Sequence, residues 1–141
     1  MSQIPLTGHC YCGAVSFEIS GDSFWVGHCH CESCRRHSGS VMTTFAGFKP
    51  DQVVYTGAMP NRHRSDGITR GFCGECGSPV SYENDDMPDE VHLQLGLFDD
   101  PDLLAAQNHS FLGEKVGWLH ADEHLPESGW DREDGLPGKA D

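Results

Sequence analysis

Three cysteines lie within six residues of one another, in the pattern Cys29-x-Cys31-x2-Cys34. Thiolates this close in the chain can reach a single metal ion, and the segment offers no obvious fourth ligand of its own. Zinc held by four protein ligands is usually structural, whereas zinc held by three keeps one position open for water or a substrate. The cluster therefore predicts an open zinc site that can do chemistry.

The other four cysteines form two pairs that are far apart in the chain. Cys10 and Cys12 come before the cluster, and Cys73 and Cys76 come after it. Two such pairs together can build a closed site with four thiolates. Gly77 permits a tight turn after the second pair, in which backbone amides can point at a thiolate sulfur. This second site is expected to be structural.

Spacing alone leaves other arrangements of the cysteines open. Cys10 and Cys12 can equally join Cys29 and Cys31, which leaves Cys34 with the later pair. Disulfides are a further alternative. Cysteines at metal-ligand spacing in a chain with no sign of export are nevertheless interpreted first as metal sites, and an odd total of seven favours the same interpretation.

Three thiolates restrict what a zinc ion can do. They donate so much negative charge that the ion becomes a weak Lewis acid, which argues against hydrolysis. An incoming thiol fits better, because zinc lowers its pKa and the bound thiolate stays nucleophilic. Thiolate attack on a small carbonyl would leave an alkoxide that needs a proton. Candidates for transferring it are His30, Glu32, Ser33 and His37. In an extended Cys-His-Cys segment His30 points away from the cysteines, which favours a structural role for it.

The chain is strongly acidic, with a formal net charge of -13. Such a field repels nucleic acid, and it also repels an anionic small substrate unless cations lie near the site. Arg35 and Arg36 directly follow Cys34, and a nearby serine, Ser38, offers a hydroxyl donor, so we expect these three residues to bind the substrate. Other arginines precede the second cysteine pair, and a solvated surface is the alternative interpretation of each arginine. They are Arg62, Arg64 and Arg70.

With 141 residues the chain has the usual size of one domain, which we expect over residues 1–130. Residues 131–141 contain mainly Gly, Pro and charge and are expected to form a mobile tail. The longest apolar runs are too short to span a membrane, and the N-terminus lacks the pattern of a signal peptide. We therefore expect a cytoplasmic protein with no membrane contact. No feature predicts its oligomeric state.

Short alternating segments are expected to position the cysteines. Glu32 to His37 predicts one helical turn directly after the cluster, residues 99–106 predict the capped start of a short helix, and residues 60–67 predict a polar loop. Strands are predicted over 15–19, 24–26, 41–48, 52–56, 68–72, 79–82 and 91–95, with short late strands at Phe111 and 116–119. The composition is that of a mainly β chain.

The chain resembles the glutathione-dependent formaldehyde-activating enzyme family, whose domain is shared by the centromere protein V group. The similarity continues through residues 96–100, His109 and Trp118, while Tyr11 stands where many relatives carry histidine. The motifs that carry it are Cys10-x-Cys12-Gly13, Cys29-His30-Cys31-x2-Cys34-Arg35-Arg36 and Phe72-Cys73-x2-Cys76-Gly77-Ser78.

This resemblance implies a mainly β fold of packed, partly curled antiparallel sheets, similar to a Rab accessory factor and stitched by a four-cysteine zinc. It also implies two zinc ions per chain and divides the ligands between them. The structural zinc takes Cys10, Cys12, Cys73 and Cys76, and the open, catalytic zinc takes Cys29, Cys31 and Cys34.

The implied activity is that of a carbon-sulfur lyase, which forms or cleaves a thiol-aldehyde adduct such as S-(hydroxymethyl)glutathione. Its partners are a small thiol such as glutathione and a small aldehyde. The alternative is a non-catalytic zinc-binding module that serves protein interaction. A fourth side chain closing the site at Cys29 would favour the module, and an open position favours the enzyme.

Overall fold

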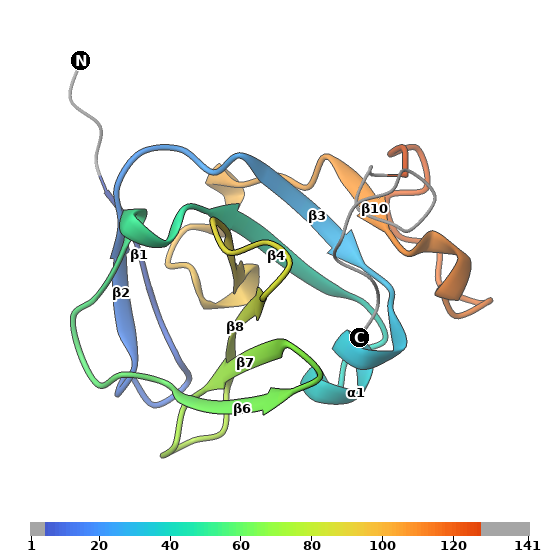
Figure 1. Cartoon of the computed structure of the whole chain (residues 1–141). Helices are drawn as coiled ribbons and strands as arrows, with labels where there is room; N and C mark the ends of the chain where they lie inside the picture. The colour runs from blue at the N-terminus through green and yellow to red at the C-terminus, as the bar shows by residue number, and fades with distance from the viewer. Residues whose placement is uncertain (1–4, 128–141) are drawn as a thin grey trace.

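The chain folds into two β-sheets, as the strand-rich sequence predicts (Figure 1). The structure, a computed structural model, describes residues 5–127. The tail predicted over 131–141 lies outside the described residues, as do both ends of the predicted domain. None of the helices within the described part has the length and apolar character needed to cross a membrane.

The smaller sheet has three antiparallel strands in the order β1-β2-β5. Its strands are β1 (Leu6–His9), β2 (Ser16–Ile19) and β5 (Val53–Tyr55). The central strand alternates as predicted, because Phe17 and Ile19 are buried while Glu18 is exposed. This sheet carries the first cysteine pair in the turn that follows β1.

The larger sheet has seven strands in the order β10-β3-β4-β9-β8-β7-β6. These strands are β3 (Trp25–Cys29), β4 (Thr43–Phe48), β6 (Asn61–Ser65), β7 (Ile68–Phe72), β8 (Pro79–Asn84), β9 (Val91–Gln94) and β10 (Asn108–Ser110). Neighbours are antiparallel except for β10, which runs parallel to β3. The prediction of purely antiparallel sheets is wrong at this edge, because the chain crosses over through short 3-10 helices before it returns beside β3.

One face of the large sheet packs against the small sheet and forms the main apolar core. Val26, Ala46 and Leu93 on the large sheet belong to the same buried cluster as Phe17 and Ile19. Val26 lies directly opposite Ala46, and Ala46 directly opposite Leu93, so the three side chains share one face of the large sheet. The core therefore lies between the two sheets.

The opposite face of the large sheet carries polar and aromatic side chains. Strand register places Arg70 directly beside Tyr82, Tyr82 beside His92, and His63 on the other side of Arg70. Trp25 lies on the same face, two strands beyond His92. Directly opposite residues in antiparallel strands share one face, so these side chains form a continuous row across the sheet.

Helix α1 (Glu32–Ser38) follows β3 directly, which confirms the predicted helical turn. Cys31 caps its first turn by accepting a hydrogen bond from the backbone N–H of Cys34. Gly39, with φ of 79°, ends the helix in the left-handed conformation that glycine adopts without steric cost. The three clustered cysteines therefore lie at the junction where β3 ends at Cys29 and α1 begins, and Figure 1 shows that the two elements follow one another directly.

Residues 60–67 do not form the predicted loop. Asn61–Ser65 is the edge strand β6, exposed along its whole length, and it forms a hairpin with β7. The turn is the pair Asp66-Gly67, both with positive φ, which is the geometry that Asp-Gly favours in two-residue hairpins. The polar composition reflects an exposed edge rather than a missing strand.

Three late predictions also need correction. The helix predicted over 99–106 is limited to the 3-10 turn η3 (Pro101–Leu103). Phe111 has φ of 54° and begins the 3-10 turn η4 (Leu112–Glu114), so it is not a strand. Residues 116–119 form a turn that the hydrogen bond from the Leu119 N–H to the Val116 carbonyl closes at 3.2 Å, and the Lys115 ammonium also donates to the carbonyls at both ends. Two further 3-10 turns are η1 (Pro50–Gln52) and η2 (Leu95–Leu97).

Gly27 is required where β3 meets β10, and replacing it with alanine tests this packing. A Cβ there would overlap a ring carbon of Trp25 and lie 2.6 Å from Asn108 Oδ1, which accepts the Trp25 Nε1 hydrogen bond at 2.8 Å. We expect Gly27→Ala to lower the free energy of unfolding by about 1 to 3 kcal/mol, the usual cost of overpacking. Gly96→Ala is the control, because a Cβ at Gly96 meets nothing within 4 Å. Equal melting temperatures for both variants would contradict the prediction.

Candidate metal centres

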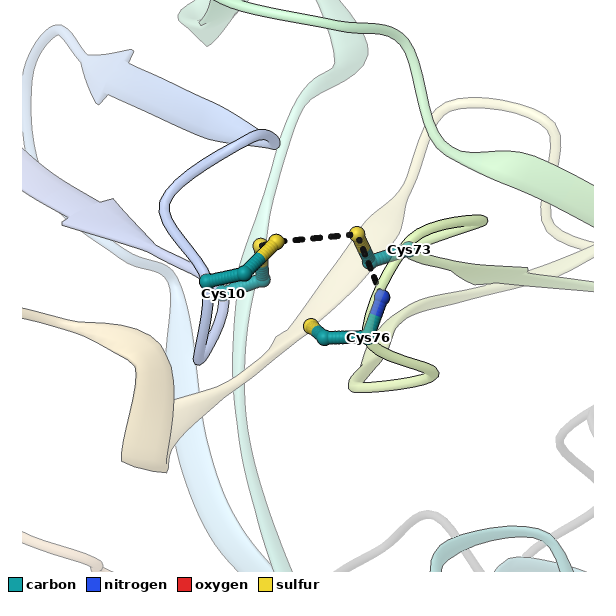
Figure 2. A group of neighbouring side chains, drawn as sticks. Cys10, Cys73 and Cys76 are labelled. Carbon is teal, nitrogen blue, oxygen red and sulfur yellow. Dashed lines mark hydrogen bonds between the residues drawn. The ribbon is translucent and has the colours of Figure 1, made fainter.

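The first candidate centre joins the two sheets. The sulfur atoms of Cys10, Cys12, Cys73 and Cys76 all lie within 4.8 Å of one another. Figure 2 shows that the turn after β1 and the turn after β7 present their cysteines to a common space. Cys12 and Cys73 are separated by 61 residues in the chain, so an ion bound here would tie the small sheet to the large one.

The sulfur spacing fits a tetrahedral zinc ion. The Cys10–Cys12 and Cys12–Cys73 sulfur distances are both 3.7 Å. A zinc–sulfur distance of about 2.3 Å places tetrahedral ligands about 3.8 Å apart, whereas a disulfide needs about 2.05 Å. All seven cysteines are free thiols, so the group has the donor set and the separation of a metal site.

Hydrogen-bond donors surround these sulfurs. Backbone N–H groups of Glu75 and Cys76 donate to Cys73 Sγ at 3.3 and 3.4 Å, as predicted for the turn that ends at Gly77. Ser78 Oγ lies 3.2 Å from Cys76 Sγ. Hydrogen bonding by Ser78 lowers the pKa of Cys76 to about 5. The turn therefore favours the thiolate form of Cys76, which is the form that binds metal.

The second candidate centre is formed by Cys29, Cys31 and Cys34. All three are buried, their sulfurs lie within 4.8 Å of one another, and Cys29 Sγ is 3.6 Å from Cys34 Sγ. Among residues 5–127, no fourth cysteine, histidine or carboxylate belongs to the group. The alternative partition, with Cys10 beside Cys29, is not the arrangement in the structure. The donor set fits a zinc ion with one open position.

The three thiols differ in their electrostatic surroundings. Hydrogen bonds from Cys29 and Cys31 lower the pKa of Cys34 well below its usual value, and the Arg70 guanidinium adds to this effect. Hydrogen bonding to Cys31 and Cys34, together with burial, raises the pKa of Cys29 well above its usual value. The pKa of Cys31 is also raised, to about 11, so metal binding has to displace protons from both Cys29 and Cys31.

Arg70 is the residue at this centre that sequence reasoning did not select. Its Nη1 and Nη2 atoms donate to Cys34 Sγ at 3.6 and 3.7 Å, and only 6% of the residue is exposed. The guanidinium carbon lies 5.0 Å from the centroid of the Tyr82 ring. In the sequence Arg70 was one of several arginines before the second cysteine pair, with nothing to distinguish it.

A pocket of about 360 Å³ lies between α1 and the β6–β7 hairpin. Arg36 lines it but Arg35 and Ser38 do not, so the structure separates the three residues predicted to bind substrate. Arg36 also pairs with Glu32 at 2.8 Å on the exposed face of α1. The full lining is Ser33, Arg36, His37, His63, Ser65, Asp66, Ile68 and Arg70.

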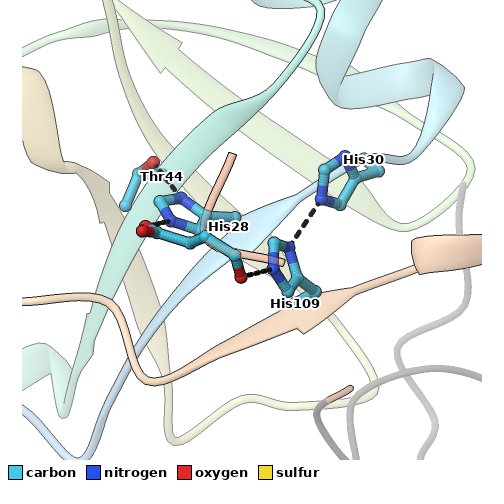
Figure 3. Close-up of polar contacts among 5 residues, drawn as sticks. His28, His30, Thr44 and His109 are labelled. Atoms are coloured by element: carbon cyan, nitrogen blue, oxygen red, sulfur yellow. Dashed lines mark hydrogen bonds and ion pairs between the residues drawn. The ribbon is translucent and has the colours of Figure 1, made fainter. Parts of the chain in front are cut away.

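A histidine network links His28 and His30 of the β3 segment to His109 of β10 (Figure 3). His30 Nε2 is 2.8 Å from His109 Nδ1, and His109 Nε2 is 2.8 Å from the backbone oxygen of Asp122. His28 contacts Thr44 Oγ1 and Asp122 Oδ2, each at 2.8 Å. Burial, with the neighbouring His109, lowers the pKa of His30 to about 4, which keeps its ring neutral near pH 7. These contacts tie β3 to β10.

A family model described as "Glutathione-dependent formaldehyde-activating enzyme" matches residues 5–114, which include both cysteine groups. The chain belongs to this family. A Halomonas elongata protein named "Putative glutathione-dependent formaldehyde-activating enzyme" is 27% identical over 124 residues, covering 81% of this chain and 79% of the relative. The fold is similar to a crystal structure of a Rhodobacter sphaeroides protein, with a TM-score of 0.56 and 21% identity over 71% of this chain and 96% of that one.

Serine replacements at the two centres should have unequal effects. We expect Cys73→Ser to lower the free energy of unfolding by more than about 3 kcal/mol, because an ion there ties the two sheets together. Cys31→Ser should cost less than half as much, because serine keeps the cap of α1 while removing one thiolate. Thermal unfolding of the zinc-loaded variants measures both. Equal, large losses would mean that both centres are structural.

Proposed function

We propose that this protein is a zinc-dependent carbon-sulfur lyase, which forms or cleaves a thiol-aldehyde adduct such as S-(hydroxymethyl)glutathione. The observation that carries the proposal is a group of three buried sulfurs with no fourth ligand among residues 5–127. A non-catalytic module would need a closed site instead. Family membership and the name of the Halomonas relative support the same activity.

In this proposal Cys29, Cys31 and Cys34 hold the catalytic zinc, and Cys10, Cys12, Cys73 and Cys76 hold the structural one. A zinc ion held there would lower the pKa of a substrate thiol and leave the thiolate nucleophilic. The thiol would release its proton to a nearby side chain, its sulfur would bond to the carbonyl carbon of formaldehyde as the C=O π electrons move to oxygen, and that oxygen would take back the released proton. Cleavage of the adduct is the reverse.

We assign the proton transfer of this reaction to side chains of α1 that line the pocket. Ser33 and His37 both line the pocket, so their side chains are placed to exchange a proton with a substrate bound there. Glu32 suits this role less, because its hydrogen bond from Arg36 lowers its pKa and keeps it ionised. His30 is buried, with Nε2 bonded to His109, and is assigned a structural role.

Recognition of the thiol's carboxylate is assigned to Arg36. Glutathione carries two carboxylates, and an acidic protein has to attract them with local cations. A guanidinium can hold a carboxylate through two hydrogen bonds, and Arg36 lies at the pocket wall with a largely exposed side chain. Arg35 and Ser38 lie outside this wall, and their binding of substrate stays a prediction.

The remaining parts of the proposal concern the setting of this chemistry. Seven free thiols suit a reducing cytoplasm, which also supplies small thiols. The net charge of -13 disfavours nucleic acid as a partner. We also propose that residues 1–130 form one domain with the fold of a Rab accessory factor, closed by the structural zinc.

Metal content and turnover test the function together. We expect two zinc ions per chain, the ion at the four-cysteine group being harder to remove with a chelator, because four ligands hold it. Mixing the protein with glutathione and formaldehyde should accelerate adduct formation, followed by NMR of the hydroxymethyl protons. Cys31→Ser should retain one zinc and lose the acceleration. A fully loaded wild-type protein without acceleration would remove the enzymatic proposal.

Arginine variants test the assignment of the carboxylate. Arg36→Ala should weaken glutathione binding by about 1.5 to 3 kcal/mol, the usual worth of a charged hydrogen bond, with unchanged zinc content. Arg35→Ala should bind as the wild type does. Glu32→Gln is the matched control, because it breaks the ion pair with Arg36 but keeps the guanidinium. Calorimetric titration distinguishes the variants, and equal weakening in Arg35→Ala and Arg36→Ala would refute the assignment.

A further inference from the structure

Arg70 brings a full positive charge to the three-cysteine centre. Strand β7 places it on the polar face of the large sheet, between His63 and Tyr82 on the neighbouring strands. From there both terminal guanidinium nitrogens donate to one sulfur, Cys34 Sγ, at 3.6 and 3.7 Å. The sequence separation of 36 residues shows that only the pairing of strands creates this contact.

The surrounding side chains hold Arg70 in a defined position. The residue is 94% buried, and a buried arginine is rare unless its charge is compensated. Its guanidinium lies over the face of Tyr82, and the Tyr82 ring stacks on His92 with a centroid distance of 5.7 Å. Cation–π contact and stacking hold the planar group against the sulfur. The charge is therefore fixed in place.

The net charge of the zinc-loaded centre indicates how a cation beside it affects ligand binding. Two positive charges on zinc and three thiolates leave one net negative charge, and an incoming thiolate would raise this to two. A neutral ligand adds no charge. A guanidinium in contact with Cys34 compensates one negative charge, so it favours the thiolate complex more than the neutral one. Compensation is strongest in a buried site, where water screens little.

We infer that Arg70 is the fixed counter-ion of the three-cysteine centre and makes that centre selective for anionic thiolates over neutral ligands. This inference rests on the proposed function, because it concerns how the same centre accepts its thiol. Arg70 acts through Cys34 and is thus a positioning residue. Arg64 is a matched control on the adjacent strand, since its side chain is exposed and pairs with Asp85.

The experiment uses full-length protein with cobalt(II) in place of zinc and two small probes. 2-Mercaptoethanol has no carboxylate, so its affinity cannot depend on a direct contact between Arg70 and a substrate carboxylate. Imidazole is a neutral ligand of similar size. We expect Arg70→Gln to weaken mercaptoethanol binding about 10- to 100-fold, the worth of a charged hydrogen bond, and to leave imidazole binding unchanged. Arg64→Gln should match the wild type.

Two further readouts report on the contact itself. Loss of N–H donors raises the energy of the sulfur electrons, so the thiolate-to-cobalt charge-transfer band of Arg70→Gln should shift to longer wavelength. Arg70→Lys keeps the charge but loses the two-pronged donation, so its loss of thiol affinity should be smaller than that of Arg70→Gln. If Arg70→Gln does not fold, the thiol affinity of Arg70→Lys relative to the wild type tests the inference instead.

The outcomes separate this inference from the proposed function. Selective loss of thiol binding supports the inference, even if the wild type forms no adduct with formaldehyde, in which case the proposed function alone fails. Unchanged thiol affinity in both Arg70 variants overturns the inference, and normal adduct formation would leave the function standing. Equal weakening of mercaptoethanol binding and imidazole binding also overturns the inference, because it indicates general damage to the centre. A wild type that binds no mercaptoethanol overturns both.

Discussion

The close approach of cysteine sulfurs is the constraint on which the rest of this structure depends. A chain with a formal net charge of -13 gathers seven cysteines into two groups, and each sulfur that ionises there needs a positive charge or hydrogen-bond donors nearby. At the four-cysteine group the partners are neutral dipoles, namely the backbone N–H groups around Cys73 and the hydroxyl of Ser78. At the three-cysteine group a full charge, that of Arg70, takes part. The two centres thus differ electrostatically before any ion binds.

The large sheet keeps these environments apart. Its apolar face packs on the small sheet and supplies the core, and its polar face carries the row that runs from His63 through Arg70 and Tyr82 to His92. Alternation along the strands makes this division possible, because neighbouring residues point to opposite faces. A core residue such as Leu93 and a polar-face residue such as His92 can therefore be neighbours on one strand without conflict. Chemistry on one face does not disturb packing on the other.

Much of this arrangement could be predicted, and the failures have physical causes. Clear alternation predicts a strand, whereas the five polar residues of β6 predict a loop, because an edge strand exposed along its whole length has no apolar face. The Asp66-Gly67 pair between two extended segments is the signal that identifies the hairpin. No comparable signal exists for the parallel pairing of β10 with β3, since a three-residue strand carries almost no pattern.

The sequence by itself determined the family, the mainly β class and the two groups of cysteine motifs, because ligand spacing and strand alternation are local properties. Tertiary structure alone decided which distant groups meet. Arg70 reaches Cys34 because the five strands from β3 to β7 pair in the observed register, and Arg36 lines the pocket while its sequence neighbour Arg35 does not. A shift of one residue in β7 would turn Arg70 to the other face, and local sequence does not encode that register.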